Sequence, residues 1–272
     1  MTILEFYASQ SSFTDPGRNS SMFEGLPKSA EEICTIIDGI CLDYDERWKY
    51  PIQNERWLET NNRYVDEFLD SIRVLNKKLP TVLEARPADE RMMTSVSHVA
   101  TMCVSMLRYV GIPARKRVGF IPAGEGFTLY EIVEYFEDGQ VKKLDPARKG
   151  EGFVRAAQAF ADFRAKKMCP CKLNCAEKKG KAVAVAALML DLAAVNKNEM
   201  LGWDRYGWML RPIDDFSDRA WEILDGVAAV LLEKDMDVEA LKAAYESEEG
   251  LMVPKMIYCD TPIIPPHKAV IR

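Results

Sequence analysis

The sequence predicts an α+β protein in which a helix packs on an antiparallel sheet, with additional helices at the N- and C-terminal ends. Apolar residues first recur every three to four positions, which is the period of a helix. Between residues 115 and 144 the pattern changes to the alternation that is typical of strands. The helical period then returns after Gly150 and continues to about residue 246.

The first third of the chain is predicted to contain a long loop and three helices. Pro, Gly, Asn and Ser are concentrated between residues 12 and 27, and these residue types favour turns. Ser29 and Glu32 form a capping-box pattern at the start of the first helix. We expect helices over 29–42, 64–75 and 96–110.

Three strands and then four helices are expected in the rest of the chain. The stretches RKRVGFI (115–121) and LYEIVEYF (129–136) read as strands, and an Asp-Gly turn at 138–139 leads into a third. The C-terminal 21 residues, from Met252, contain too many prolines for a helix and are expected to lie extended over the surface. The later helices are predicted at 153–166, 181–195, 217–232 and 237–246.

No internal repeat or low-complexity linker divides the sequence, so we expect a single domain. Its expected parts are an N-terminal helical part, a core and a helical C-terminal extension, at 1–80, 81–149 and 150–272.

Composition argues against two classes of partner. The 36 Lys and Arg are outnumbered by 42 Asp and Glu, whereas nucleic-acid binding needs clustered basic residues. The longest apolar run, 182–190, is about half of the ~20 residues that cross a bilayer. No secretory signal is recognisable at the N-terminus, so we expect a cytoplasmic protein. The expected partner is a small-molecule substrate or ligand. The sequence indicates no oligomeric state.

The seven cysteines are expected to be free thiols, because an odd number in a reducing compartment indicates no disulfide framework. Cys169, Cys171 and Cys175 form a C-x-C-x3-C pattern. A metal there would need a fourth ligand from elsewhere, since zinc sites use four. Whether these three cysteines bind a metal stays open. We predict no metal or cofactor.

Two stretches, LRYVGIPARKRVGF and YEIVEYFEDGQVKKLDPA, are similar to the transglutaminase-like superfamily, whose members share a papain-like core. The pattern covers residues 91–147, and FTDPGRN and DLAAVNKNEMLGWDRYG resemble a bacterial subgroup. The resemblance implies a cysteine at a helix N-terminus, a histidine on the next strand and an aspartate on the strand after it. The helix terminus and the imidazolium would lower the pKa of the thiol.

The sequence departs from that family at two of the three catalytic positions. The position of the nucleophile corresponds to Val96 and that of the histidine to Tyr130, while Asp145 matches the aspartate. Valine cannot attack a carbonyl, and tyrosine, with a usual pKa of about 10, is a poor base at neutral pH. Cys103 lies two turns further along the helix and is expected in the core. We therefore expect neither a cysteine-dependent transglutaminase nor a cysteine protease.

Polar residues near the same helix are the candidates for chemistry. His98 is either a general acid or base or a polar cap of the first turn. Ser95 and Ser97 are either nucleophiles or helix caps. Tyr130 with Asp145 either orients a substrate group or packs over the core with its hydroxyl satisfied.

A second group of polar residues could bind a substrate. In NKNEMLGWDRYGW the residues Lys197, Glu199, Trp203 and Asp204 are either a pocket wall for a carboxylate or amine, or a salt-bridged helix cap. Arg18 is either a turn residue or a carboxylate clamp.

Three functions follow from these residues. The first is a repurposed enzyme, in which His98, Tyr130 and Asp145 carry out non-covalent acid-base chemistry on a small molecule. The second is a pseudoenzyme that binds a ligand or partner in the old cleft. The third is a serine-dependent acyl hydrolase or acyltransferase that uses Ser95 or Ser97 with His98.

Overall fold

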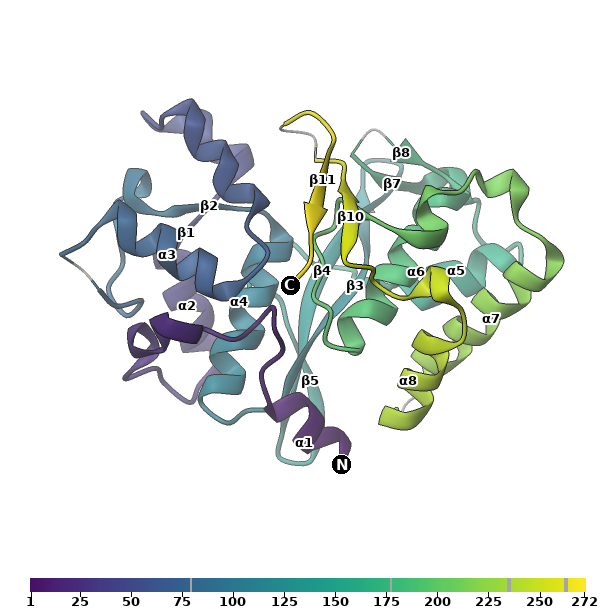
Figure 1. Ribbon diagram of the computed structural model, residues 1–272, viewed down its shortest axis with the longest axis horizontal. Coiled ribbons are helices and arrows are strands. Elements are labelled where there is room, and N and C mark those ends of the chain that lie inside the picture. Colours follow the sequence, from purple (N-terminus) through teal and green to yellow (C-terminus); the bar gives the residue numbers. More distant parts are fainter. Residues whose placement is uncertain (79, 177, 234–235, 262–263) are drawn as a thin grey trace. The chain divides into compact units, whose positions relative to one another are not determined.

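The chain contains both helices and sheets of several strands, which confirms the mixed composition expected from the sequence. The computed structural model in Figure 1 describes residues 1–78, 80–176, 178–233, 236–261 and 264–272. The chain forms two compact units. Unit 1 consists of residues 1–3, 117–131 and 150–272, and unit 2 of residues 4–116 and 132–149.

These units can be compared with the parts expected from the sequence. The division expected after Lys149 coincides with one unit boundary, whereas the division expected after residue 80 lies inside unit 2. A single domain would require a fixed placement of the two units, and it stays a prediction.

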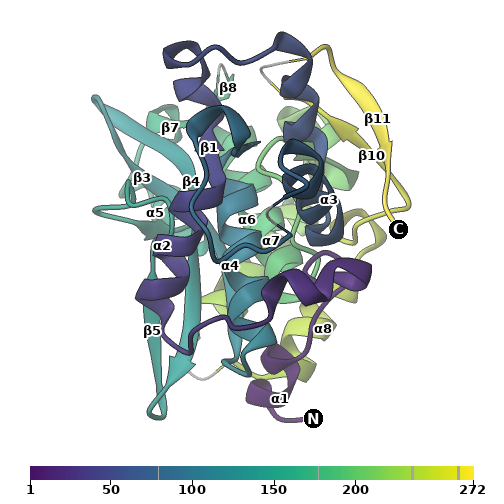
Figure 2. The ribbon, with the colours of Figure 1, turned by 90° about the vertical axis from the view of Figure 1, so that its left-hand side faces the viewer.

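Unit 2 is built around helix α4 (Val96–Tyr109), which runs between α2 (Ala30–Ile40) and α3 (Val65–Leu75) (Figure 2). Every residue of α4 from Ser97 to Arg108 is buried. The three helices begin and end within two residues of the predicted bounds. Local apolar spacing suffices to predict α2 and α3 because one face of each enters the same core, whereas α4 is buried on all sides.

Short helices occupy much of the remaining N-terminal chain. They are α1 and four 3-10 helices, none of which was expected. In the segment 12–27 the side chains of Met22 and Phe23 are buried, so part of the expected loop contributes to the core. The elements are α1 (Ile3–Ala8), η1 (Gly17–Phe23), η2 (Tyr44–Lys49), η3 (Asn54–Asn61) and η4 (Ala88–Glu90).

Two short strands of unit 2 pair in parallel. Strand β1 (Cys41–Asp43) follows α2, and β2 (Met92–Thr94) leads directly into α4. Their register pairs Cys41 with Met92 and Asp43 with Thr94. This pairing joins segments about fifty residues apart and was not predicted.

The predicted strands of the middle segment are present as β3 (Ala114–Ala123), β4 (Gly126–Glu137) and β5 (Gln140–Leu144). Strands β4 and β5 are antiparallel, with Val133 opposite Leu144. Both turn residues, Asp138 and Gly139, have positive φ, as a two-residue hairpin turn requires. Strands β3 and β4 each contribute residues to both units.

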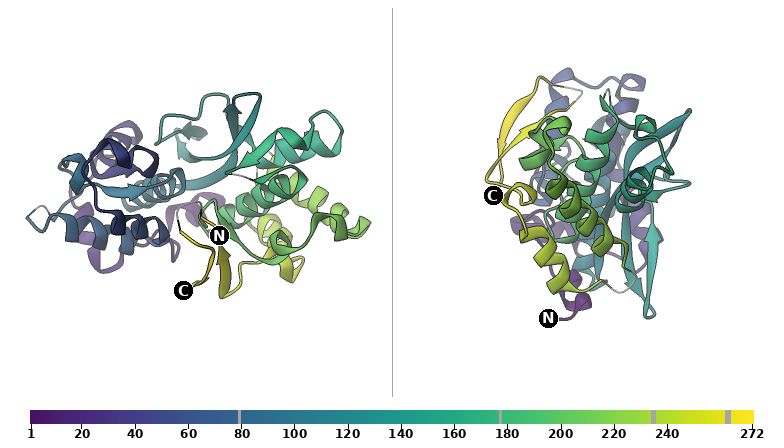
Figure 3. Two further views of the ribbon diagram at one scale, coloured as in Figure 1. Left: turned by 90° about the horizontal axis from the view of Figure 1, so that it is seen from above. Right: turned by 90° about the vertical axis from the view of Figure 1, so that its right-hand side faces the viewer.

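Unit 1 combines the other part of this sheet with a group of helices. The strand order is β6-β3-β4-β7-β8, with β6 (Val154–Arg155), β7 (Leu173–Cys175) and β8 (Lys178–Lys179). Helix α6 is almost entirely buried and contacts α5, α7 and α8 (Figure 3). The helices are α5 (Ala156–Arg164), α6 (Lys181–Val195), α7 (Asp218–Leu232) and α8 (Val238–Glu246), with 3-10 helices η5 (Pro170–Lys172), η6 (Gly207–Leu210), η7 (Ile213–Asp215) and η8 (Glu249–Leu251).

The C-terminal segment is extended, as expected, but it is part of a sheet. Strand β10 (Met256–Cys259) pairs antiparallel with β9 (Asp204–Arg205) and with β11 (His267–Val270). Ile257 and Cys259 are buried, so one face of β10 packs inward. None of the helices in the described ranges has the length and apolar character needed to cross a membrane.

Candidate functional site

A pocket of about 270 Å³ lies in unit 2 beside the first turn of α4. Five charged side chains contribute to its lining, together with Tyr50, Thr94, Ser95 and Val96. The charged residues are Asp38, Asp43, Glu46, Arg91 and Lys149. The pocket therefore brings carboxylates and cations together at one helix terminus.

The parallel pair β1–β2 builds this pocket. Because the carboxyl ends of parallel strands meet at one edge, Asp43 at the end of β1 lies opposite Thr94 at the end of β2. The Thr94 hydroxyl donates to the carbonyl oxygen of Leu42 at 3.2 Å. The chain then passes through Ser95 into α4, so the helix begins at the wall of the pocket.

The charged groups are partly paired with one another. Lys149 Nζ lies 2.6 Å from Asp43 Oδ2, and this hydrogen bond raises the pKa of Lys149. Asp38 pairs with Arg148 at 2.9 Å. Partial burial raises the pKa of Asp38, and the nearby charges of Arg148 and Arg91 offset part of that effect. Asp38 is thus a carboxyl group that holds its proton more readily than usual.

Two residues at the pocket decide whether covalent thiol chemistry is possible. Val96 is half-buried and lines the pocket at the first position of α4. Cys41, which sequence reasoning missed, also lines it. Burial, followed by the charge of Asp38, raises the pKa of the Cys41 thiol to about 12, although a hydrogen bond with Thr94 and the charge of Arg91 oppose the shift. The Cys41 thiol is therefore protonated at neutral pH and is a poor nucleophile.

His98 and Ser95 form a reciprocal capping box at the start of α4. The backbone N–H of Ser95 donates to His98 Nδ1 at 3.1 Å, and the Ser95 hydroxyl oxygen lies 2.8 Å from the same nitrogen. The imidazole is completely buried and packs on Phe68, with ring centroids 5.3 Å apart. It does not line the pocket.

The surroundings of His98 keep its imidazole neutral. Burial lowers its pKa to about 3, and the positive charges of Lys116 and Arg63 act in the same direction. Backbone hydrogen bonding at Asn62 and Thr60 offsets part of this shift. At neutral pH the ring is a hydrogen-bonding helix cap with little affinity for a proton.

The remaining catalytic candidates lie in three places. Ser97 is buried, and its carbonyl oxygen accepts from the Thr101 hydroxyl at 2.8 Å. Asp145 follows β5 in unit 2, where its carboxylate accepts from the Ala147 N–H at 3.2 Å. Tyr130 is a buried residue of unit 1. Of the five catalytic candidates, Ser95 alone lines the described pocket.

The candidates for substrate binding do not line this pocket either. Arg18 forms an exposed ion pair with Asp70 of α3. The other four candidates belong to unit 1, where Asp204 is the first residue of β9 and the connection between α6 and β9 contains Lys197, Glu199 and Trp203. Glu199 and Trp203 are buried, and the Asp204 carboxylate accepts from the Leu201 N–H at 3.0 Å. Such contacts are typical of a well-packed loop that follows a helix.

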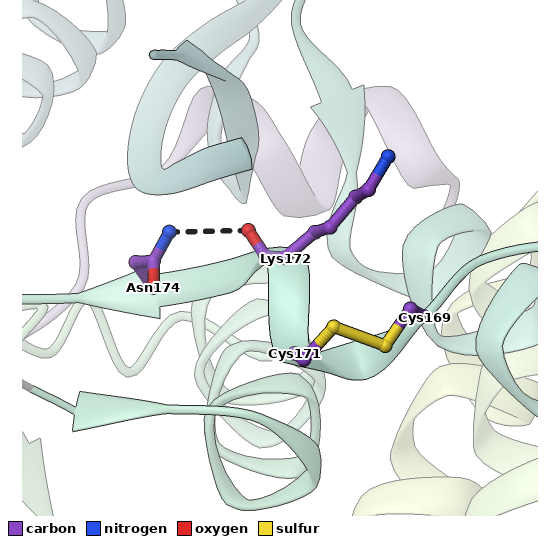
Figure 4. The surroundings of a disulfide bond; sticks show 4 residues. All are labelled: Cys169, Cys171, Lys172 and Asn174. Carbon is purple, nitrogen blue, oxygen red and sulfur yellow. Dashed lines mark hydrogen bonds between the residues drawn. A yellow bond between two sulfur atoms is a disulfide. The ribbon is translucent and has the colours of Figure 1, made fainter. Parts of the chain in front are cut away.

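The expectation of free thiols throughout the chain is wrong at one place. Cys169 and Cys171 form a disulfide, so two of the three sulfurs considered for a metal are bonded to each other (Figure 4). Two cysteines separated by one residue can come within bonding distance without any long-range contact, and a count of cysteines does not detect this. Among the described residues, no group of three or more His, Cys, Asp or Glu side chains is arranged to hold a metal ion.

Residues that sequence reasoning missed make up most of the pocket. Asp38, Asp43, Glu46 and Arg91 carry no motif, and Arg91 joins the three carboxylates because β1 pairs with β2. Comparisons of the chain with protein-family models, with curated proteins and with solved structures gave no match.

Proposed function

We propose that unit 2 binds a small zwitterionic molecule in the pocket at the start of α4 and carries out non-covalent acid-base chemistry on it. The observation that carries this proposal is the meeting of three carboxylates and two cations around one cavity, with Val96 beside them. The proposal keeps the first of the functions expected from the sequence and changes the residues that perform it.

The size and charge of the pocket support a ligand of this class. A volume of about 270 Å³ lies just below the range of about 300–1,000 Å³ that is usual for ligand pockets, which fits an amino-acid-sized compound. Arg91, Lys149 and the positive end of the α4 dipole would attract an anionic group. Asp38, Asp43 and Glu46 would attract an amine.

Asp38 is the group that supports acid-base chemistry. Its raised pKa brings proton exchange closer to neutral pH than for an ordinary aspartate. His98, by contrast, is a poor base because its pKa is lowered to about 3. We therefore assign the proton transfer to Asp38.

The resemblance to transglutaminase-like proteins is consistent with this proposal. It would put the pocket at the N-terminus of the helix that carries the catalytic cysteine in that family, with Val96 at the position of the cysteine. Loss of the nucleophile would leave a polar cleft that is free to hold another ligand.

Calorimetry with γ-aminobutyrate, its N-acetyl derivative and its methyl ester tests the binding. We expect the zwitterion to bind at least about tenfold more tightly than either blocked form, because each block removes one charge. Asp38→Asn should weaken binding, whereas Arg18→Gln, outside the pocket, should not. Equal binding of all three compounds would contradict the proposal.

Proton transfer is tested separately. Incubation with amino acids in D₂O, followed by NMR, detects exchange of a carbon-bound proton that depends on Asp38. Tight binding without exchange would leave a pseudoenzyme, the second of the expected functions.

A second candidate function is supported by the distance of 2.8 Å between Ser95 Oγ and His98 Nδ1. Ser95 lines the pocket at a helix N-terminus, which is a suitable position for the nucleophile of an acyl hydrolase or acyltransferase. The low pKa of His98 argues against it, because the imidazole must accept the proton of the serine. A fluorophosphonate probe that labels wild-type protein, but not Ser95→Ala, would favour this function.

A further inference from the structure

Cys169 and Cys171 lie at the surface of unit 1, in the connection between α5 and β7. Both residues are exposed, and η5 begins at the proline between them. We infer that this disulfide is a redox-active site that exchanges with small anionic thiols. The disulfide belongs to unit 1, whereas the pocket belongs to unit 2.

The bond contributes little to holding the fold together. The entropy that a disulfide removes from the unfolded chain grows with the logarithm of the number of residues in the loop that it closes. This loop contains only three residues. Structural disulfides close much longer loops to stabilise a fold. The bond is therefore better explained by reactivity than by stabilisation.

Contacts independent of the disulfide hold the same segment in place. The Lys172 N–H donates to the Cys169 carbonyl oxygen at 3.1 Å, and the Asn174 side-chain amide donates to the Lys172 carbonyl oxygen at 3.1 Å (Figure 4). Strand β7 pairs with β4 immediately afterwards. These contacts do not involve sulfur, so the frame should persist on reduction and keep the two thiols close enough to bond again.

The charge around the disulfide favours anionic partners. Residues 166–181 contain six lysines and one glutamate, in a chain whose net charge is −6. Lys166, Lys167, Lys172 and Lys179 are exposed, and Lys178 pairs with Asp260. A positive potential stabilises thiolates and raises the local concentration of anionic thiols.

The reaction that we propose is thiol–disulfide exchange. A small thiolate attacks one sulfur, forms a mixed disulfide and releases the other cysteine as a thiolate. A second small thiolate then attacks the outer sulfur of the mixed disulfide and releases the first cysteine. The two small thiols become one disulfide, and the protein gains two thiols, which take up two protons. The reverse reaction reoxidises the protein.

The test uses the full-length protein equilibrated in glutathione buffers of graded ratio, followed by alkylation and mass spectrometry. We expect Cys169 and Cys171 to change together between oxidised and reduced forms, with circular dichroism unchanged. Cys169→Ser should trap a mixed disulfide at Cys171. Cys175→Ser is the matched control: this half-buried thiol accepts from Arg205 at 3.4 Å, and we expect the variant to exchange like the wild type. Resistance of the pair to reduction, or unfolding on reduction, would overturn the inference.

The preference for anions is tested with Lys167→Gln/Lys172→Gln. At low salt this variant should react several-fold more slowly with glutathione, and it should react at the wild-type rate with uncharged 2-mercaptoethanol. The difference should disappear at high salt because mobile ions screen the lysines. Equal rates with glutathione in the variant and the wild type would show that the site does not select anionic thiols.

Discussion

Ser95 and His98 hold each other at the first turn of α4 through a reciprocal capping box, in which His98 Nδ1 accepts from the backbone N–H of Ser95. A nitrogen that accepts this hydrogen bond carries no proton. The imidazole is therefore neutral, which agrees with the lowering of its pKa to about 3. A histidine that could be taken for a catalytic base is a structural cap.

The first prediction concerns pH. The unfolded chain binds a proton on His98 below about pH 6.5, whereas the folded chain does so only below about 3. Between these values acid favours the unfolded state. As the pH falls through this range, the titration of His98 lowers the free energy of unfolding by up to about 1.4 kcal/mol per pH unit. His98→Gln keeps an acceptor for the capping box but does not titrate. Urea denaturation between pH 4 and 6 should show a shallower pH dependence for this variant. If the free energy of unfolding of the variant and of the wild type changed equally with pH, the low pKa assigned to His98 would be contradicted.

The second prediction separates the two roles of Ser95. If the hydroxyl is a helix cap, Ser95→Ala should cost about 1 kcal/mol of stability, and Ser95→Gly only about a few tenths of a kcal/mol. Ser95→Gly removes the nucleophile without adding a charge to the pocket, so any activity that does not use a serine nucleophile should survive in it. Thermal unfolding and ligand binding measure the two effects. Loss of activity in a stable Ser95→Gly variant would favour the acyl-transfer function instead.

The third prediction concerns a buried ion pair of unit 1. Arg117 of β3 and Asp191 of α6 are fully buried, with Arg117 Nη2 2.7 Å from Asp191 Oδ2. Asp191 Oδ1 also accepts from the Val118 N–H at 2.8 Å. Asp191→Leu should cost about 3–5 kcal/mol, because the guanidinium stays buried without this carboxylate. The double variant Arg117→Met/Asp191→Leu should be less destabilised than Asp191→Leu in chemical denaturation. If the double variant lost as much stability as the two single variants together, the two charges would not compensate each other.

The fourth prediction compares two glycines of unit 1. A Cβ on Gly126 would lie 2.5 Å from the carbonyl oxygen of Lys172, so Gly126→Ala must displace the connection that carries the disulfide. We expect a loss of about 1–3 kcal/mol. Gly226 lies within α7 and has no atom within 4 Å of an added Cβ. Gly226→Ala should therefore stabilise the protein by up to about 1 kcal/mol. Melting temperatures that move in the same direction would contradict this reading.

The fifth prediction concerns the thiols of unit 2. With a pKa of about 12, roughly one Cys41 side chain in ten thousand is ionised at pH 8. Burial also raises the pKa of Cys103. Iodoacetamide should leave both residues unmodified in the folded protein and should modify them after denaturation. Rapid labelling of Cys41 in the folded state would restore a thiol mechanism at the pocket.

Helices were predictable from the sequence where local spacing determines them. The bounds of α6 agree with those predicted, and those of α3 agree to within one residue. The apolar residues of α3 repeat with the period of the helix, whereas α6 is an almost continuous apolar run that is buried on nearly every side. Ser29 was expected as a cap, and its hydroxyl accepts from the Glu32 N–H. These features depend on residues three or four positions apart.

The pocket was not predictable because it depends on contacts between distant segments. Asp43 and Arg91 both line it only because a strand of three residues pairs with another about fifty residues later. Nothing near Asp38 or Glu46 in the sequence indicates a site. The position of His98 on the helix was predicted, but its burial depends on Phe68 and other residues of separate elements.

The hairpin of β3 and β4 has a consequence for how the protein is made. The chain leaves unit 2 after Lys116 and re-enters it at Ile132, so each unit is assembled from separated stretches. No single cut releases either unit as one continuous fragment. On the ribosome, unit 2 cannot be completed before residue 149 has emerged, although most of it is encoded before residue 117. Attempts to express either unit alone should therefore use a gene in which the stretches are rejoined by a linker.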